Sequence, residues 1–131
     1  MPVTIAVIAH APLASALKQC TQHVYACDSR VESRILAFDV QPDADIDAVS
    51  SMVSARLPSQ GAQTLVLTDV IGATPSNIAH RMLVHANTVV IAGVNLAMLL
   101  TAVCHSDADL PELVDLVKNA GISSIAEKTA S

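Results

Sequence analysis

Two side chains in this sequence, His10 and Asp69, have the chemical types and the positions that phosphoryl transfer needs. His10 follows the apolar run over residues 3–9, and Asp69 follows the run over residues 64–68. A neutral imidazole can attack phosphorus through one ring nitrogen when a carboxylate holds the proton on the other nitrogen. We therefore predict that His10 is the nucleophile and phosphoryl acceptor, and that Asp69 orients its ring.

The loop after Asp69 offers hydrogen-bond donors for the transferred group. Its sequence, V-I-G-A-T-P-S-N, contains Gly72, Thr74 and Ser76. A phosphoryl group carries negative charge on its equatorial oxygens, so N–H and hydroxyl donors stabilise it. We predict that Thr74 is the N-cap of a helix with Pro75 at the first helical position. Gly72, Thr74 and Ser76 are then expected to bind the phosphoryl group, and this chemistry needs neither a metal ion nor a cofactor.

These side chains need a scaffold that brings the ends of separate strands together. Short apolar runs rich in β-branched residues alternate along the chain with segments of helical periodicity. The predicted strands cover residues 3–9, 35–40, 64–68 and 88–92, and the second of them suits an edge or near-edge position. The alternation predicts one α/β domain over residues 1–131, with an open, mainly parallel sheet and helices on both faces. Ligands of such sheets bind beyond the carboxyl ends of the strands, where His10 and Asp69 stand.

The end of the chain is predicted to add one more helix and a short strand. Asp109 and Glu112 have the spacing of a capping box, and Gly121 is expected to stop the helix that follows. The apolar run over residues 122–125 is then expected to form a last short strand.

Composition excludes several other classes of protein. The net charge is −5 and the chain has no run of Lys or Arg, which argues against nucleic-acid binding. The three cysteines show neither a C-x-x-C pair nor zinc-finger spacing, which is typical of reduced thiols. The apolar N-terminus lacks a basic region, and polar residues interrupt the uncharged segment 82–106. We therefore predict a cytoplasmic protein without membrane insertion.

Three segments together resemble the IIA domain of the mannose family of the bacterial phosphoenolpyruvate-dependent sugar phosphotransferase system (PTS). They are I-A-V-I-A-H-A, L-T-D-V-I-G-A-T-P-S-N-I-A and V-I-A-G-V-N-L-A-M-L-L, and the resemblance covers nearly the whole chain. It implies an EIIA phosphotransferase that takes a phosphoryl group from the phosphohistidine of HPr on His10. Asp69 would be the hydrogen-bonding partner of His10, and Thr74 would lie close to the phosphate.

The same resemblance implies further partners. A separate IIB component would accept the phosphoryl group, in sugar uptake or its regulation. The family also implies a homodimer in which a final antiparallel strand, here residues 122–125, is exchanged between subunits. The chain departs from the usual family pattern in having Ala9 and Ala11 around the histidine. It also has Val70 and Ile71 where a Thr-Trp pair is more typical.

Three alternative functions remain at this point. The first is the phosphoryl-donor subunit of a dihydroxyacetone kinase, which uses a related IIA-like domain. The second is a receiver domain phosphorylated on Asp69, which would need an acidic cluster after the first strand, where this sequence has Ala-His-Ala. The third is a non-catalytic regulatory module in which His10 is inert.

Overall fold

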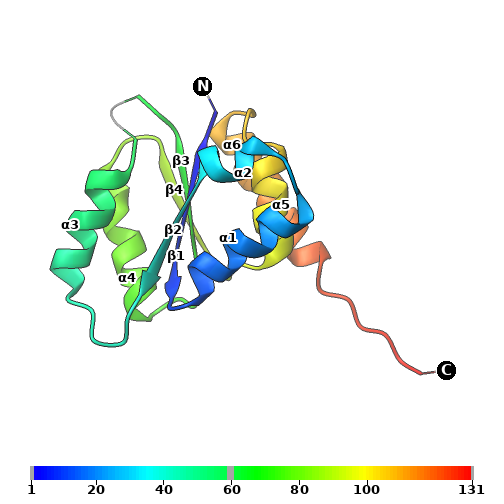
Figure 1. Ribbon diagram of the computed structural model, residues 1–131, viewed down its shortest axis with the longest axis horizontal. Coiled ribbons are helices and arrows are strands. Elements are labelled where there is room, and N and C mark those ends of the chain that lie inside the picture. Colours follow the sequence, from blue (N-terminus) through cyan, green and yellow to red (C-terminus); the bar gives the residue numbers. More distant parts are fainter. Residues whose placement is uncertain (1, 59–60, 131) are drawn as a thin grey trace.

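The computed structural model describes residues 2–58 and 61–130, and a sheet of four parallel strands lies at its centre. The strands are β1 (Thr4–His10), β2 (Ile35–Val40), β3 (Thr64–Thr68) and β4 (Thr88–Ala92). Their order across the sheet is β2-β1-β3-β4, and each neighbouring pair is parallel. The carboxyl ends of the strands therefore meet at one edge of the sheet (Figure 1). The predicted α/β class, the parallel sheet and the edge position of β2 are confirmed.

Helices cover both faces of this sheet, as predicted. They are α1 (Leu13–Val24), α2 (Ser29–Arg34), α3 (Ile46–Arg56), α4 (Thr74–Arg81), the 3-10 turn η1 (Met82–Val84), α5 (Leu96–Cys104) and α6 (Leu110–Ser123). Helices α3 and α4 lie on one face, whereas α1, α5 and α6 lie on the other (Figure 1). Within residues 2–58 and 61–130, no helix is both long enough and apolar enough to cross a membrane.

The two faces of β1 form the centres of two apolar cores. Successive side chains of a strand point to opposite faces. Ile5, Val7 and Ala9 pack with α1, α5 and α6, whereas Ala6 and Ile8 pack with α3 and α4. Because both faces are buried, the strand must be apolar at nearly every position, which explains its unbroken run of Val, Ile and Ala.

The C-terminal prediction is wrong in two respects. Helix α6 continues through Gly121 to Ser123, and residues 122–125 do not form a strand in this chain. Gly121 instead lies in a close contact between helices, since a Cβ atom at this position would lie 2.7 Å from Cγ of Met98 in α5. Glycine at this position permits that contact rather than ending the helix. The chain beyond α6 then leads away from the body of the molecule (Figure 1).

Candidate functional site

His10 is the last residue of the central strand β1 and lies at the carboxyl edge of the sheet. In the register of the sheet it pairs with Val40, the last residue of β2, and Asp69 directly follows β3 on the other side. The alternation of β1 places His10 on the face that α3 and α4 cover. Its side chain is 52% exposed, so the imidazole is open to solvent.

Asp69 holds both the ring and the backbone of His10. Its Oδ2 atom lies 2.7 Å from the His10 Nδ1 atom and also accepts the His10 backbone N–H at 2.9 Å. Oδ1 accepts the N–H of Val70 at 2.8 Å. The backbone carbonyl of Asp69 accepts the N–H of Gly93, at the end of β4, at 2.8 Å. The structure thus brings together the two residues that the sequence singled out, and it fixes the carboxylate from several directions.

This geometry assigns the tautomer of His10. A carboxylate oxygen only accepts hydrogen bonds, so the Nδ1 atom facing Asp69 must carry the proton. In the neutral ring, Nε2 then has a free lone pair, and no group in the described part of the chain bonds to it. The site therefore presents a nucleophilic nitrogen to solvent.

The same hydrogen bonds keep Asp69 ionised. Burial of the carboxyl group acts to raise its pKa. The hydrogen bonds from the His10 backbone, from the imidazole and from the Val70 N–H outweigh this effect, and the pKa of Asp69 lies below its ordinary value. At neutral pH, Asp69 is therefore a carboxylate able to orient the ring and to stabilise a positive charge on it.

The loop between β3 and α4 is shaped by Ser76. Gly72 has φ +87°, a left-handed conformation that favours glycine, and its N–H donates to Ser76 Oγ at 3.0 Å. Ser76 Oγ in turn donates to the carbonyl of Ala73 at 3.1 Å, and the side chain is 1% exposed. In this conformation Ser76 uses its hydroxyl inside the loop and faces away from solvent.

The N-cap of α4 is Ala73 and not Thr74, which corrects the predicted start by one residue. Ala73 has extended backbone angles, whereas Thr74 and Pro75 already belong to the first helical turn. A side chain caps a helix from the extended position that precedes it, so Thr74 does not act as the cap. The hydroxyl of half-buried Thr74 makes no hydrogen bond to any described residue. The predicted phosphate-binding loop thus retains this free hydroxyl beside the first turn of α4.

Sequence reasoning missed a contact on the other side of His10. The N–H of Ser15 in α1 donates to Asp39 Oδ1 at 3.0 Å, and the Ser15 hydroxyl donates to Asp39 Oδ2 at 2.5 Å. Asp39 lies in β2, directly beside Ala9. A signal was present in the sequence, because Asp39 is the one charged residue in the otherwise apolar run I-L-A-F-D-V.

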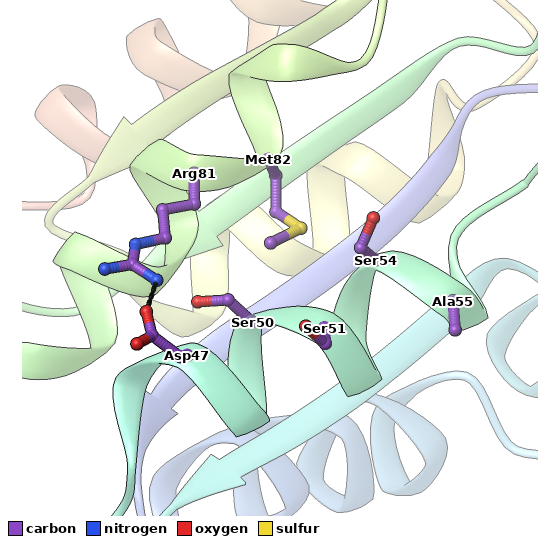
Figure 2. A pocket seen from close by; sticks show the side chains of 7 residues that line it. All are labelled: Asp47, Ser50, Ser51, Ser54, Ala55, Arg81 and Met82. Carbon is purple, nitrogen blue, oxygen red and sulfur yellow. Dashed lines mark hydrogen bonds and ion pairs between the residues drawn. The ribbon is translucent and has the colours of Figure 1, made fainter.

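A hollow of the surface lies between α3 and α4. The residues that line it do not include His10 or Asp69. Its volume is about 490 Å³, and none of the predicted site residues lines it. Figure 2 shows Asp47 and Arg81 paired across this groove, with Ser50 between them and Met82. Because its charged groups pair with each other, we assign no chemistry to this groove. In the described part of the chain, no three His, Cys, Asp or Glu side chains are grouped to hold a metal ion.

Several solved structures with the same fold are PTS proteins. The mannose/sorbose-specific IIA subunit from Enterococcus faecalis superimposes with a TM-score of 0.83 at 23% identity, covering 100% of this chain and 98% of that one. A PTS component EIIA from Streptococcus agalactiae gives 0.83 at 20% identity, with coverage of 95% and 96%. The IIA protein associated with the fucose utilization operon of Streptococcus pneumoniae gives 0.78 at 22% identity, with coverage of 96% and 93%.

These TM-scores establish a common fold, and a comparison with a sequence model of the family establishes the family. No curated protein matches the chain. The family model EIIA-man, described as "PTS system fructose IIA component", matches residues 4–119 of the 131. That span contains all four strands, His10, Asp69 and the loop before α4. This chain therefore belongs to the EIIA-man family of PTS IIA components.

Proposed function

We propose that this protein accepts a phosphoryl group from the phosphohistidine of HPr on Nε2 of His10 and passes it to a separate IIB component. The process it serves is sugar uptake or its regulation, in the cytoplasm. The observation that carries the proposal is the 2.7 Å contact between His10 Nδ1 and the largely buried carboxylate of Asp69, beside an exposed ring. It gives the imidazole one nitrogen held protonated and one nitrogen free to react.

The transfer step balances without any further reagent. The lone pair of His10 Nε2 forms a bond to phosphorus as the bond from phosphorus to the HPr imidazole breaks, and the HPr nitrogen keeps that electron pair. The His10 ring then carries phosphorus on Nε2 and hydrogen on Nδ1, so it is positively charged. Asp69 stabilises this cation. In the second transfer the IIB acceptor forms a bond to phosphorus as the bond from phosphorus to His10 Nε2 breaks, and Nε2 keeps that electron pair.

His10 is a better acceptor than Asp69 in this geometry. Both Asp69 oxygens already accept N–H groups, and its side chain is only 9% exposed. Phosphorylation of Asp69 would displace these donors and bury the phosphoryl group. The receiver-domain alternative is therefore disfavoured.

The first turn of α4 supplies donors for the phosphoryl oxygens in this proposal. The first N–H groups of a helix have no intrahelical acceptor, and the helix dipole favours negative charge there. Thr74 contributes its N–H and its free hydroxyl, while Gly72 provides the turn that brings the loop to the strand end. Ser76 was predicted to contact phosphate directly, and its buried hydroxyl supports the shape of the loop instead. The proposal includes no metal ion and no cofactor.

An exposed apolar pair beside the site offers a docking surface for HPr and for IIB in turn. Val70 and Ile71 directly follow Asp69 and are 60% and 72% exposed. Apolar side chains exposed next to a reactive group are typical of a protein interface. They also separate the transferred group from water once a partner covers them.

A homodimer is also part of the proposal. In the described sheet, β4 is an end strand with one unpaired edge. A hollow of about 280 Å³ beside it is lined by Ile91 of β4 and by Ile122 and Ile125 near the chain end, and the latter two are strongly exposed. An open strand edge beside exposed isoleucines favours association with a second copy. Exchange of the C-terminal segment between the subunits stays a prediction.

The experiment that tests the function is transfer of radioactive phosphate from phosphoenolpyruvate through enzyme I and HPr to the purified protein. A label that is lost in acid and kept in base supports phosphohistidine, whereas a label lost in base as well overturns His10 in favour of a carboxylate. Purified IIB should then remove the label. Removal by the kinase and nucleotide of a dihydroxyacetone kinase, but not by IIB, would replace the proposed acceptor.

A further inference from the structure

We propose that Asp39 is a positioning residue for phosphoryl transfer, because through Ser15 it fixes the loop that joins His10 to α1. This inference rests on the proposed function of His10. It is carried by the two hydrogen bonds from Ser15 to the Asp39 carboxylate, of 3.0 Å from the N–H and 2.5 Å from the hydroxyl.

The way in which α1 is capped is unusual. Leu13 is the first helical residue, and Pro12 occupies the N-cap position, where it has no side chain able to accept a hydrogen bond. The N–H of Ser15, the third residue of the helix, would usually be accepted by the cap residue itself. Here it is accepted from a neighbouring strand by Asp39. A local cap would stabilise the helix without attaching it to the sheet, whereas this one joins α1 to β2.

The attachment point lies next to the reacting residue. Asp39 pairs with Ala9 in the register of β1 and β2, one position before His10. The N–H of Ala11 donates to the carbonyl of Val40 at 3.0 Å, so the ladder between these strands extends one residue beyond His10. Only Ala11 and Pro12 separate His10 from the start of α1. The chain is therefore fixed on both sides of a two-residue link.

His10 is thus held from both neighbouring strands. Asp69, after β3, fixes its backbone N–H and its Nδ1 atom, and Asp39, in β2, fixes the segment that follows. Asp69 alone fixes His10 itself but not the two-residue link that follows it. A nucleophile displaced by about 1 Å loses on the order of 100-fold in rate, so this second attachment has a kinetic consequence.

The Asp39 carboxylate also determines which helix can receive the phosphoryl group. It occupies the first turn of α1 with a negative charge and uses the N–H of Ser15. An anion at that turn would meet this charge, whereas no carboxylate in the described part of the chain accepts a hydrogen bond from the first turn of α4. The arrangement directs the phosphoryl group toward Thr74.

The test measures single-turnover phosphorylation by phospho-HPr over a range of HPr concentrations, with urea unfolding of each variant as a check of folding. Asp39→Ala removes both acceptor oxygens, and Asp39→Asn keeps one oxygen for the Ser15 N–H. Ser15→Ala removes only the hydroxyl and serves if Asp39→Ala folds poorly. Asp43→Ala is the matched control, because this exposed acid follows β2 on the same edge and no hydrogen bond to its side chain occurs among the described residues.

The inference predicts that Asp39→Ala lowers the rate constant at saturating HPr by about tenfold or more, with Asp39→Asn and Ser15→Ala affected less. The half-saturating HPr concentration and the Asp43→Ala control should stay within about twofold of the wild type. A folded Asp39→Ala variant with an unchanged saturating rate would overturn the inference, since a merely stabilising role lowers only the urea midpoint. Equal losses in Asp39→Ala and Asp43→Ala would overturn it as well, by showing a general effect of charge. If the wild type takes up no phosphoryl group, the proposed function itself fails, which is a different result from failure at Asp39.

Discussion

Replacement of Asp69 by Asn tests how the carboxylate controls the reactive ring. The two Asp69 oxygens accept three N–H groups, from the His10 backbone, the His10 ring and Val70. An amide has one oxygen and one NH₂ group, so the side chain of the Asp69→Asn variant cannot accept on both sides. If its oxygen serves His10, the NH₂ group faces the N–H of Val70. If it turns over, the NH₂ group faces Nδ1 and favours the tautomer with hydrogen on Nε2, which cannot attack.

The size of the effect follows from the bond that is lost. A hydrogen bond to a charged group contributes about 1.5–3 kcal/mol, and each 1.4 kcal/mol corresponds to about a tenfold change in rate. In the transfer step positive charge develops on the ring, so the carboxylate stabilises the transition state more than the neutral ground state. We expect Asp69→Asn to lower the single-turnover rate constant by roughly 10- to 150-fold, with no comparable change in the HPr concentration needed for half saturation.

Rapid-quench transfer from phospho-HPr measures this rate constant. Asp43→Asn is the control for loss of one negative charge at the same edge of the sheet, and it should react like the wild type. A rate constant for Asp69→Asn within about threefold of the wild type would refute the role of the carboxylate.

The lowered pKa of Asp69 adds a stability signature to the same variant. A carboxyl group whose pKa is lower in the folded state stabilises that state above its unfolded pKa, near the ordinary value of 3.8. This contribution is lost as the pH falls below that value through the folded pKa. The difference in urea midpoint between wild type and Asp69→Asn should therefore narrow as the pH falls below about 4. A difference that widens in acid would contradict the sign of the pKa shift.

Two further predictions concern the C-terminal part of the fold. Gly121→Ala should lower the free energy of unfolding measured in urea, since overpacking against Met98 costs about 1–3 kcal/mol and better helix propensity returns about 1 kcal/mol. Combining it with Met98→Ala should remove the clash, and a midpoint for the single variant at or above the wild type would refute the contact. Sedimentation should give a mass of about 27 kDa, twice the 13.6 kDa of the chain, and Ile125→Lys should shift it toward the monomer. A wild-type protein that stays monomeric at high concentration would exclude the proposed dimer.

The architecture and the meeting of His10 with Asp69 could be predicted because they depend on patterns within short segments. A strand buried on both faces must be apolar throughout, and this marks β1 and β3 clearly. Once the strands are known to be parallel, residues at their carboxyl ends must share one edge. His10 and Asp69 therefore lie together whatever their side-chain conformations are.

The features that sequence reasoning missed depend on contacts between distant segments. The role of Gly121 is decided by Met98 in another helix, so its local signal for a helix end was misleading. The link from Ser15 to Asp39 joins residues 24 positions apart, so the one charged residue of the run I-L-A-F-D-V does not reveal which residue it binds. The short helix α2 has a cap at Asp28, which accepts the Arg30 N–H, but it is too short and too polar to show an apolar periodicity.

The most direct test of the central claim is the intact mass of the wild type and of His10→Ala after incubation with phosphoenolpyruvate, enzyme I and HPr. The His10 side chain is half exposed and contributes to neither apolar core, so the variant should fold. We predict a single phosphoryl adduct on the wild type and none on His10→Ala. An adduct of equal yield on His10→Ala, or no adduct on the wild type while HPr is shown to be charged, would contradict the claim that His10 carries the phosphoryl group.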